Sequence, residues 1–282
     1  MSSLPLIRIR TKLVIALFTL ISASCACATD AASPAELDFG YQQMYNLDFP
    51  GAHATFRAYQ AAHPEDPLGH VSNAAAYLFS EFNRLHILES DLFIDDRNFE
   101  NRGKLTPDPV VKAEFEKELA TSTDLANKVL AQSPQDKNAL FSQVLANGLR
   151  GDYAAMVEKR NLASLSFMKT SRGLAERLLA VDPTCYDAYL AIGVENYLLG
   201  SKSAPVRWLL QMTGAQTDKD EGIERLRLTA NKGRYLAPFA RLLLAVAALR
   251  DQDRQTARML LAGLASQFPG NHLYAKELAR IQ

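Results

Sequence analysis

Apolar and small residues recur along this chain at helical spacing, and four of the helical runs end at a proline. In the clearest copy, Ala52 and Phe56 lie twelve and eight residues before Pro64. Small residues or leucine keep these offsets before three more prolines, Pro134, Pro183 and Pro269. Such self-similarity predicts stacked helical hairpins in which small residues mark close helix contacts. No segment alternates apolar and polar residues over a useful strand length, so the predicted fold class is all-α.

The same pattern divides the chain into about five hairpins. Helices are predicted over 34–46, 51–63, 67–88, 110–132, 137–149, 153–180, 186–200, 218–232, 235–250 and 253–267, with a terminal helix from residue 272. The glycines within 148–152 are interpreted as the turn of the third hairpin. Two insertions, at 90–109 and 201–217, interrupt the second and fourth hairpins. We therefore predict one repeat domain over residues 29–282.

The first hairpin resembles a tetratricopeptide repeat. Gly40, Ala52, Phe56 and Pro64 match that family's small-residue, aromatic and proline positions, whereas Glu36 stands where the family usually has a bulky aromatic. The resemblance implies a tetratricopeptide-like helical-hairpin solenoid, wound as a right-handed superhelix with extended loops and helices.

A second resemblance covers residues 204–235. On the segments 205–210, 218–223 and 233–235, this part of the chain looks like the C-terminal part of tetratricopeptide proteins of the Iml2/TTC39 type. That grouping implies helical-repeat architecture and no established catalytic motif.

The N-terminus is typical of a bacterial export signal. Arg8, Arg10 and Lys12 precede an apolar run over 13–21 that is too short to span a membrane, and small residues follow it. We predict a signal peptide over 1–28. The mature protein is then expected in the periplasm or at the outer membrane, with secretion as an alternative.

Cysteine usage leaves two alternatives at the N-terminus. Cys25 could be lipidated, although Ser22 stands where such sites usually carry leucine. If cleavage follows residue 28 instead, Cys185 is the last remaining cysteine and no internal disulfide can form. We interpret Cys185 as a half-buried hairpin residue rather than a reactive thiol.

Charge argues against two classes of partner. The whole chain has 31 basic and 31 acidic residues, and without the first 28 residues, which hold three basic and no acidic ones, 28 basic face 31 acidic. Nucleic acid and anionic membrane surfaces both need a dense basic patch. We therefore predict no nucleic-acid partner, and membrane contact only through a possible lipid anchor.

No motif predicts catalysis, a cofactor or a metal. The five histidines, none of which lies one helical turn from another, are His53, His63, His70, His86 and His272. The chain has no HExxH, GxSxG or phosphate-binding glycine loop, and its acidic loop lacks the ligand order of a calcium hand. The adjacent Asp95 and Asp96 point apart and are interpreted as surface charge.

A partner is instead expected in the concave face, which the first helix of each hairpin lines in tetratricopeptide stacks. Aligning the hairpins places eight polar residues, here called the groove stripe, on that face: Tyr41, Tyr45, Asn73, Tyr77, Gln143, Asn147, Glu195 and Asn196. Amides and tyrosines suit an extended peptide or polar ligand. The alternative is that these groups satisfy helix ends or face water. The stripe lacks the basic residues of the family's carboxylate clamp.

Both insertions carry apolar residues in polar surroundings. The first contains Leu92, Phe93, Ile94 and Phe99, and the second contains Trp208, the chain's single tryptophan. We expect these segments to fold back over the stack's own core rather than to present an anchor to a partner, because exported monomers rarely leave such groups exposed.

The sequence thus predicts a non-enzymatic adaptor of the cell envelope that holds a protein or peptide partner in its groove. One alternative is a small-ligand-binding protein or enzyme with a site between groove and insertions, which a buried His or Asp facing the groove would favour. Another is a structural subunit of an envelope complex, which would show a large apolar outer patch.

Overall fold

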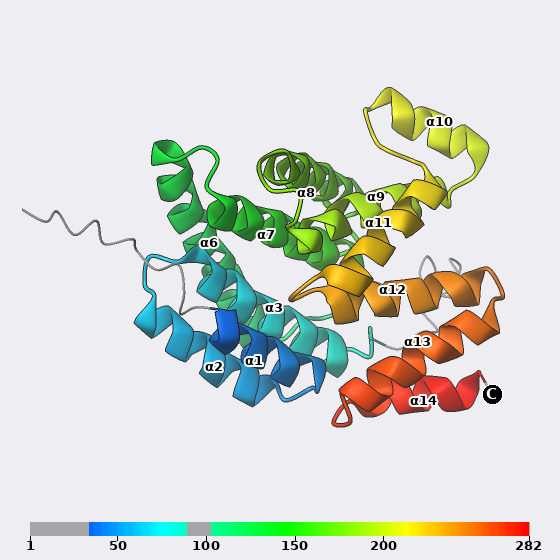
Figure 1. Ribbon diagram of the computed structural model, residues 1–282, viewed down its shortest axis with the longest axis horizontal. Helices are drawn as coiled ribbons and strands as arrows, with labels where there is room; N and C mark the ends of the chain where they lie inside the picture. The colour runs from blue at the N-terminus through cyan, green and yellow to red at the C-terminus, as the bar shows by residue number, and fades with distance from the viewer. Residues whose placement is uncertain (1–33, 89–102, 282) are drawn as a thin grey trace, which may run out of the picture. The chain divides into compact units, whose positions relative to one another are not determined.

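Neighbouring helices pair into hairpins in the computed structural model (Figure 1). The structure describes residues 34–88 and 103–281. The predicted signal peptide, Cys25 and the apolar residues of the first insertion lie outside them. The described part of the chain contains twelve α-helices, one short 3-10 helix and no strand. The predicted all-α class built from helical hairpins is therefore confirmed.

The helices form five pairs along the chain. Their bounds are α1 Pro34–Tyr45, α2 Phe49–Ala62, α3 Pro67–Arg84, α6 Pro109–Gln132, α7 Lys137–Met156, α8 Asn161–Val181, η1 Tyr186–Ala188, α9 Tyr189–Gly200, α10 Ala204–Met212, α11 Lys219–Lys232, α12 Ala237–Arg250, α13 Arg254–Gln267 and α14 His272–Arg280. The pairs are α1 with α2, α3 with α6, α7 with α8, α9 with α11 and α12 with α13, and α14 packs on α13. All of these helices belong to one compact unit, Ser33–Gln282.

Small residues sit where the repeat frame predicted close helix contacts. Ala52 and Ala257 are fully buried, as is Phe56. A Cβ added to Gly40 would overlap the Phe56 ring, so only glycine lets α1 approach α2 over that aromatic side chain.

Aspartate fixes where most hairpin helices begin. Asp66 Oδ1 accepts from the N–H of Leu68 at 2.8 Å, and Asp136 Oδ1 accepts from Ala139 at the same distance. Such caps satisfy backbone donors that have no partner within the helix. Each cap fixes the residue at which its helix begins, and so the position of the turn that separates it from the preceding helix.

The third hairpin differs from the prediction. Helix α7 continues through Gly148 and Gly151 to Met156, so 148–152 is not a turn. A Cβ on Gly151 would lie 3.5 Å from Phe167 and 3.6 Å from the Ser164 carbonyl, which shows that α8 packs closely on α7 here. The glycines serve helix packing, and α8 consequently begins at Asn161 rather than near Tyr153.

The first and last hairpins are in contact. Asp38 and Arg234 form two parallel hydrogen bonds of 2.9 Å each. Asn271 Nδ2 donates to the Tyr45 carbonyl at 2.9 Å, and the N–H of Gly270 donates to Asn46 Oδ1 at 3.0 Å. The segments that flank the C-terminal hairpin therefore bind helix α1 and the residue that follows it.

The contact at Gly40 predicts a large effect of one methyl group. Gly40→Ala should lower the free energy of unfolding by about 1–3 kcal/mol, because the buried Phe56 ring has no room to move. Urea unfolding measures this. Gly263→Ala is the matched control, since a Cβ there meets nothing within 4 Å, and it should stabilise α13 by about 0.5–1 kcal/mol. Equal effects of the two substitutions would contradict the packing argument.

Candidate functional site

The groove stripe lies inside the protein. Each of its eight residues is at most 8% exposed, and Asn73 and Glu195 are fully buried. The expectation of an open, partner-facing stripe is thus not met in this structure. Buried amides and carboxylates require hydrogen-bond partners, and here the chain itself supplies them.

Tyr41 and Tyr45 are covered by the segment that leads into α12. The Tyr41 ring stacks on Tyr235 at a centroid distance of 4.8 Å, and its hydroxyl bonds Ser72 Oγ at 3.1 Å. Tyr45 Oη donates to the Tyr235 carbonyl at 3.0 Å. Tyr235 occupies the position in which a bound peptide was expected.

Asn73 and Tyr77 are satisfied by neighbouring helices. Asn73 Nδ2 donates to Glu118 Oε1 at 2.8 Å, and His53 Nδ1 donates to Asn73 Oδ1 at 2.6 Å. Arg57 donates to the Tyr77 hydroxyl at 2.7 Å. Burial lowers the pKa of His53, which favours the neutral imidazole within this network.

The side-chain amides of Gln143 and Asn147 likewise form hydrogen bonds with groups of the chain itself. Gln143 Nε2 donates to Asn127 Oδ1 at 3.0 Å, and Asn147 Nδ2 donates to the Gln143 carbonyl at 2.8 Å. Gln143 therefore joins α7 to α6, whereas Asn147 bonds within α7.

Glu195 and Asn196 anchor the second insertion. Glu195 accepts from Arg172 Nε at 2.9 Å and from the N–H of Gln216 at 3.1 Å. Asn196 Oδ1 accepts from the N–H of Asp218 at 3.1 Å, and its Nδ2 donates to Gln216 Oε1 at 2.9 Å. These two residues hold the chain that returns from α10 to α11.

Asp187 was not singled out from the sequence. Its carboxylate accepts three backbone N–H groups, from Arg234 at 3.0 Å, Tyr235 at 3.1 Å and Leu236 at 3.0 Å. Burial raises the pKa of the Asp187 carboxyl, and the three donors act in the opposite direction. The residue fixes the segment that covers Tyr41, a role that no local pattern indicates.

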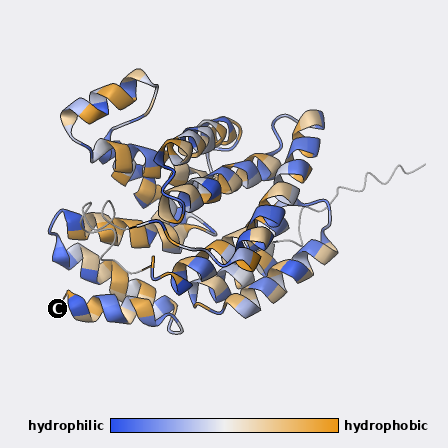
Figure 2. Cartoon of the chain, turned by 180° about the vertical axis from the view of Figure 1, so that it is seen from behind, coloured by the Kyte–Doolittle hydropathy of each residue, from blue (hydrophilic) through white to orange (hydrophobic). Residues whose placement is uncertain are grey.

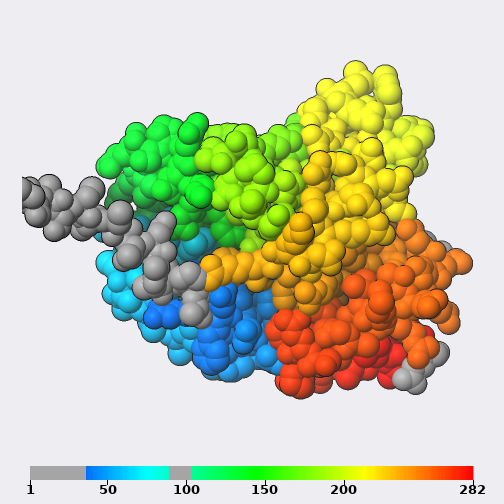
Figure 3. Space-filling model, in the orientation of Figure 1, coloured from blue at the N-terminus to red at the C-terminus, as the bar shows by residue number. Residues whose placement is uncertain are grey.

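The second insertion contains helix α10, whose apolar side chains point outward. Val206 is 44% exposed, Trp208 63%, Leu209 60% and Met212 68%. No residue of α10 is buried. The expectation that this insertion folds back over the core is wrong: α10 stands away from the other helices (Figure 1), carries orange residues in the hydropathy view (Figure 2) and forms a projection in the space-filling view (Figure 3).

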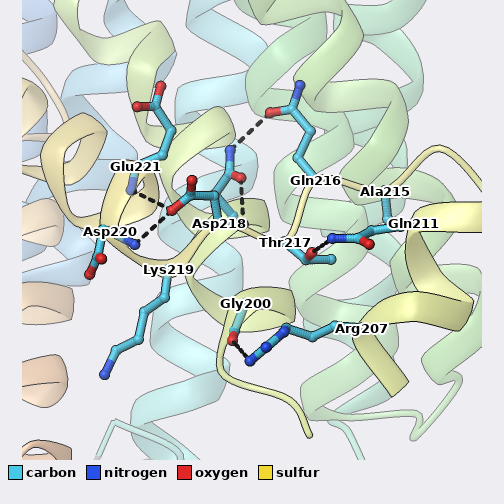
Figure 4. Close-up of a pocket in the computed structure, with 11 residues that line it drawn as sticks. Gly200, Arg207, Gln211, Ala215, Gln216, Thr217, Asp218, Lys219, Asp220 and Glu221 are labelled. Carbon is cyan, nitrogen blue, oxygen red and sulfur yellow. Dashed lines mark hydrogen bonds between the residues drawn. The ribbon is translucent and has the colours of Figure 1, made fainter. Parts of the chain in front are cut away.

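The polar residues of α10 face the protein. Arg207 donates to the carbonyl of Lys202 at 3.3 Å, and Gln211 Nε2 donates to Thr217 Oγ1 at 2.6 Å. Both line an open pocket between α9, α10 and the start of α11 (Figure 4). Most apolar side chains of the helix thus point outward, with Leu210 half-buried, while Arg207 and Gln211 bond back to the adjoining loops, the reverse of the usual orientation of a surface helix.

Other candidate chemistry can be located in the same way. In residues 34–88 and 103–281, no three His, Cys, Asp or Glu side chains are grouped to hold a metal ion. Within these ranges, no helix has both the length and the apolar character needed to cross a bilayer. Cys185 is half-buried, and burial raises the pKa of its thiol to about 11, so the thiolate is disfavoured.

A similar solved structure is that of a thermophilic tetratricopeptide-repeat protein of Thermus thermophilus. The match covers 89% of this chain and 98% of that chain, with a TM-score of 0.45 and 14% sequence identity. No protein-family model and no curated protein matches the chain. The functional argument therefore rests on the geometry described above.

Glu195 is expected to be essential for the second insertion. Glu195→Ala leaves Arg172 without its buried partner, so the free energy of unfolding should fall by about 3 kcal/mol. The N–H of Gln216 should also exchange faster with solvent, which hydrogen-exchange mass spectrometry measures. Glu224→Ala is the control because its ion pair with Arg227 is exposed, and it should change stability by no more than about 0.5 kcal/mol. Unchanged exchange at Gln216 in Glu195→Ala would contradict this anchoring role.

Asp152 in α7 predicts a pH dependence. Its carboxyl makes no hydrogen bond or ion pair with another described residue, and burial raises its pKa from 3.8 to about 7. The folded protein therefore retains a proton that the unfolded chain releases, so this group lowers stability as pH rises from about 4 to 7. Asp152→Asn should match the wild type near pH 4 and exceed its unfolding free energy by about 4 kcal/mol at pH 8. Urea unfolding at both pH values measures the difference, and a pH-independent difference would contradict it.

Proposed function

We propose that this protein is a non-enzymatic interaction scaffold of the cell envelope that docks through the outer face of α10 rather than through an open concave groove. The inverted orientation of α10 carries this proposal. Four of the ten large apolar side chains that are exposed in the described residues lie on this helix of nine residues. An apolar patch that is gathered on one element marks an interaction site, whereas scattered apolar residues do not.

The base of α10 is held in a defined position, which supports docking. Glu195 and Asn196 bind the backbone of residues 216 and 218, while Arg207 and Gln211 bind the loop on either side of the helix. Helix and loop are thereby ordered before any partner arrives. Such preorganisation lowers the entropic penalty of binding.

The filled interior argues for the outer face over the groove. A peptide bound along the groove stripe would have to displace Tyr235 from Tyr41 and residues 216–218 from Glu195 and Asn196. Groove binding by these residues stays a prediction. The envelope location rests on the export signal predicted for residues 1–28, and among the alternatives a structural envelope subunit fits an apolar outer patch best.

A matched pair of double variants tests the proposal. Leu209→Ser with Met212→Ser removes apolar area from α10, whereas Leu162→Ser with Met259→Ser removes the same residue types from exposed positions elsewhere. The full chain of each variant is mixed with envelope fragments and sedimented. The α10 variant should bind at least about tenfold more weakly, because each lost apolar side chain contributes about 1.5–3 kcal/mol when buried.

The control pair should bind as the wild type does, and both variants should unfold at the wild-type urea concentration because all four residues are exposed. Equal loss in both pairs, or no loss in either, would contradict docking through α10.

A further inference from the structure

The apolar surface of α10 is unusually broad. Going round the helix, only Arg207 and Gln211 are polar, and both bond to the protein's own loops, although Gln211 is itself exposed. At 100° per residue the apolar positions cover about 240° of the circumference. A helix that fits into a groove of a partner protein needs an apolar stripe of roughly 100°. A helix that is apolar on every side not held by its own protein suits surroundings that are apolar on every side.

Charges around α10 are basic. From residue 197 to residue 217 the chain has Lys202 and Arg207 and no acidic residue. Of the acidic residues that border this stretch, Glu195 binds Arg172, Asp218 caps α11 and Glu221 binds Arg225, while Asp220 lines the pocket beside α10. Lys169 of α8 adds a further cation, since it binds the Thr213 carbonyl after α10. The stretch 197–217 therefore carries an apolar tip and two basic residues, while Asp218, Asp220 and Glu221 line the pocket at its base.

A second copy of the chain fits this surface poorly. Stable protein interfaces use roughly 20–30 residues on each side, whereas the outward apolar face of α10 consists of Val206, Trp208, Leu209 and Met212 together with the small residues at its start. A lipid interface needs no matching surface shape. Tryptophan is also the residue that favours the headgroup region.

We infer that α10 is an interfacial anchor that enters the headgroup region of an anionic lipid bilayer, a membrane contact that the overall charge of the chain did not predict. This inference rests on the proposed function, because it names the envelope component to which the outer face of α10 docks. Trp208, Leu209 and Met212 enter the interface, while Lys202 lies at the level of the anionic headgroups. The protein sits on the bilayer through α10, which is too short to cross it.

Trp208 provides the test because it is the chain's single tryptophan. The full chain is titrated with vesicles of phosphatidylcholine and phosphatidylglycerol in a 3:1 ratio, and with vesicles of phosphatidylcholine alone. Tryptophan emission should shift to shorter wavelength, and acrylamide quenching should fall about threefold or more as the ring leaves water. Anionic vesicles should act at lower lipid concentration than neutral ones. The reporter lies on α10, so binding through the N-terminal segment alone leaves its emission unchanged.

Variants that keep Trp208 separate the contribution of the apolar side chains to bilayer binding from that of the positive charge. Leu209→Ser with Met212→Ser should weaken partitioning at least about tenfold on both vesicle types, and Leu162→Ser with Met259→Ser should leave it unchanged. Lys202→Gln should weaken partitioning about fivefold on anionic vesicles and leave it unchanged on neutral ones.

Three results would overturn the inference, and they differ in what they leave standing. Unchanged Trp208 emission with anionic vesicles, together with binding to envelope fragments that requires Leu209 and Met212, would make the occupant a protein and keep the proposed function. Shielding of Trp208 that rises with protein concentration in the absence of lipid would make the occupant a second copy. Binding to neither vesicles nor envelope fragments would remove the proposed function as well.

Discussion

Three backbone N–H groups of residues 234–236 converge on the buried carboxylate of Asp187. The covering of Tyr41 and Tyr45 depends on this contact. It holds Tyr235 where the ring stacks on Tyr41 and the carbonyl accepts from Tyr45. The C-terminal hairpin is thereby packed against the first one, and the ion pair between Asp38 and Arg234 lies at the same junction. A carboxylate in an apolar interior is tolerated only when several donors satisfy it, and here those donors also position a segment of chain.

Satisfaction of buried polar groups explains why the groove stripe is not a surface. Asn73, Glu195 and Asn196 each bind groups from another helix or loop, and an unsatisfied buried amide or carboxylate would destabilise the fold by a few kcal/mol. The same residue types on an open face would bind a peptide by the same hydrogen bonds. Their chemistry is therefore compatible with both roles, and the packing of other segments determines which one is realised.

Helix α10 shows the opposite arrangement. Its two polar side chains bind the protein's own loops, which leaves the apolar side chains facing outward. Folding alone gains nothing from this orientation, since burial of Trp208 and Leu209 against the stack would be favourable. The docking proposed for this face would account for it, and the bonds from Glu195 and Asn196 connect the buried polar residues to the loop that carries α10.

The sequence by itself determined the pairing of the hairpin helices, but neither helix α10 nor the true end of α7. Helical periodicity, prolines and the frame of Gly40, Ala52 and Phe56 depend on contacts within one hairpin, so a local pattern contains them. Only the tertiary structure decided which polar residues are buried and which way α10 faces. Asn73 meets Glu118 from 45 residues away, and Asp38 meets Arg234 from 196 residues away. A repeat pattern defines the faces of each helix, but contacts between distant segments determine which of those faces is covered.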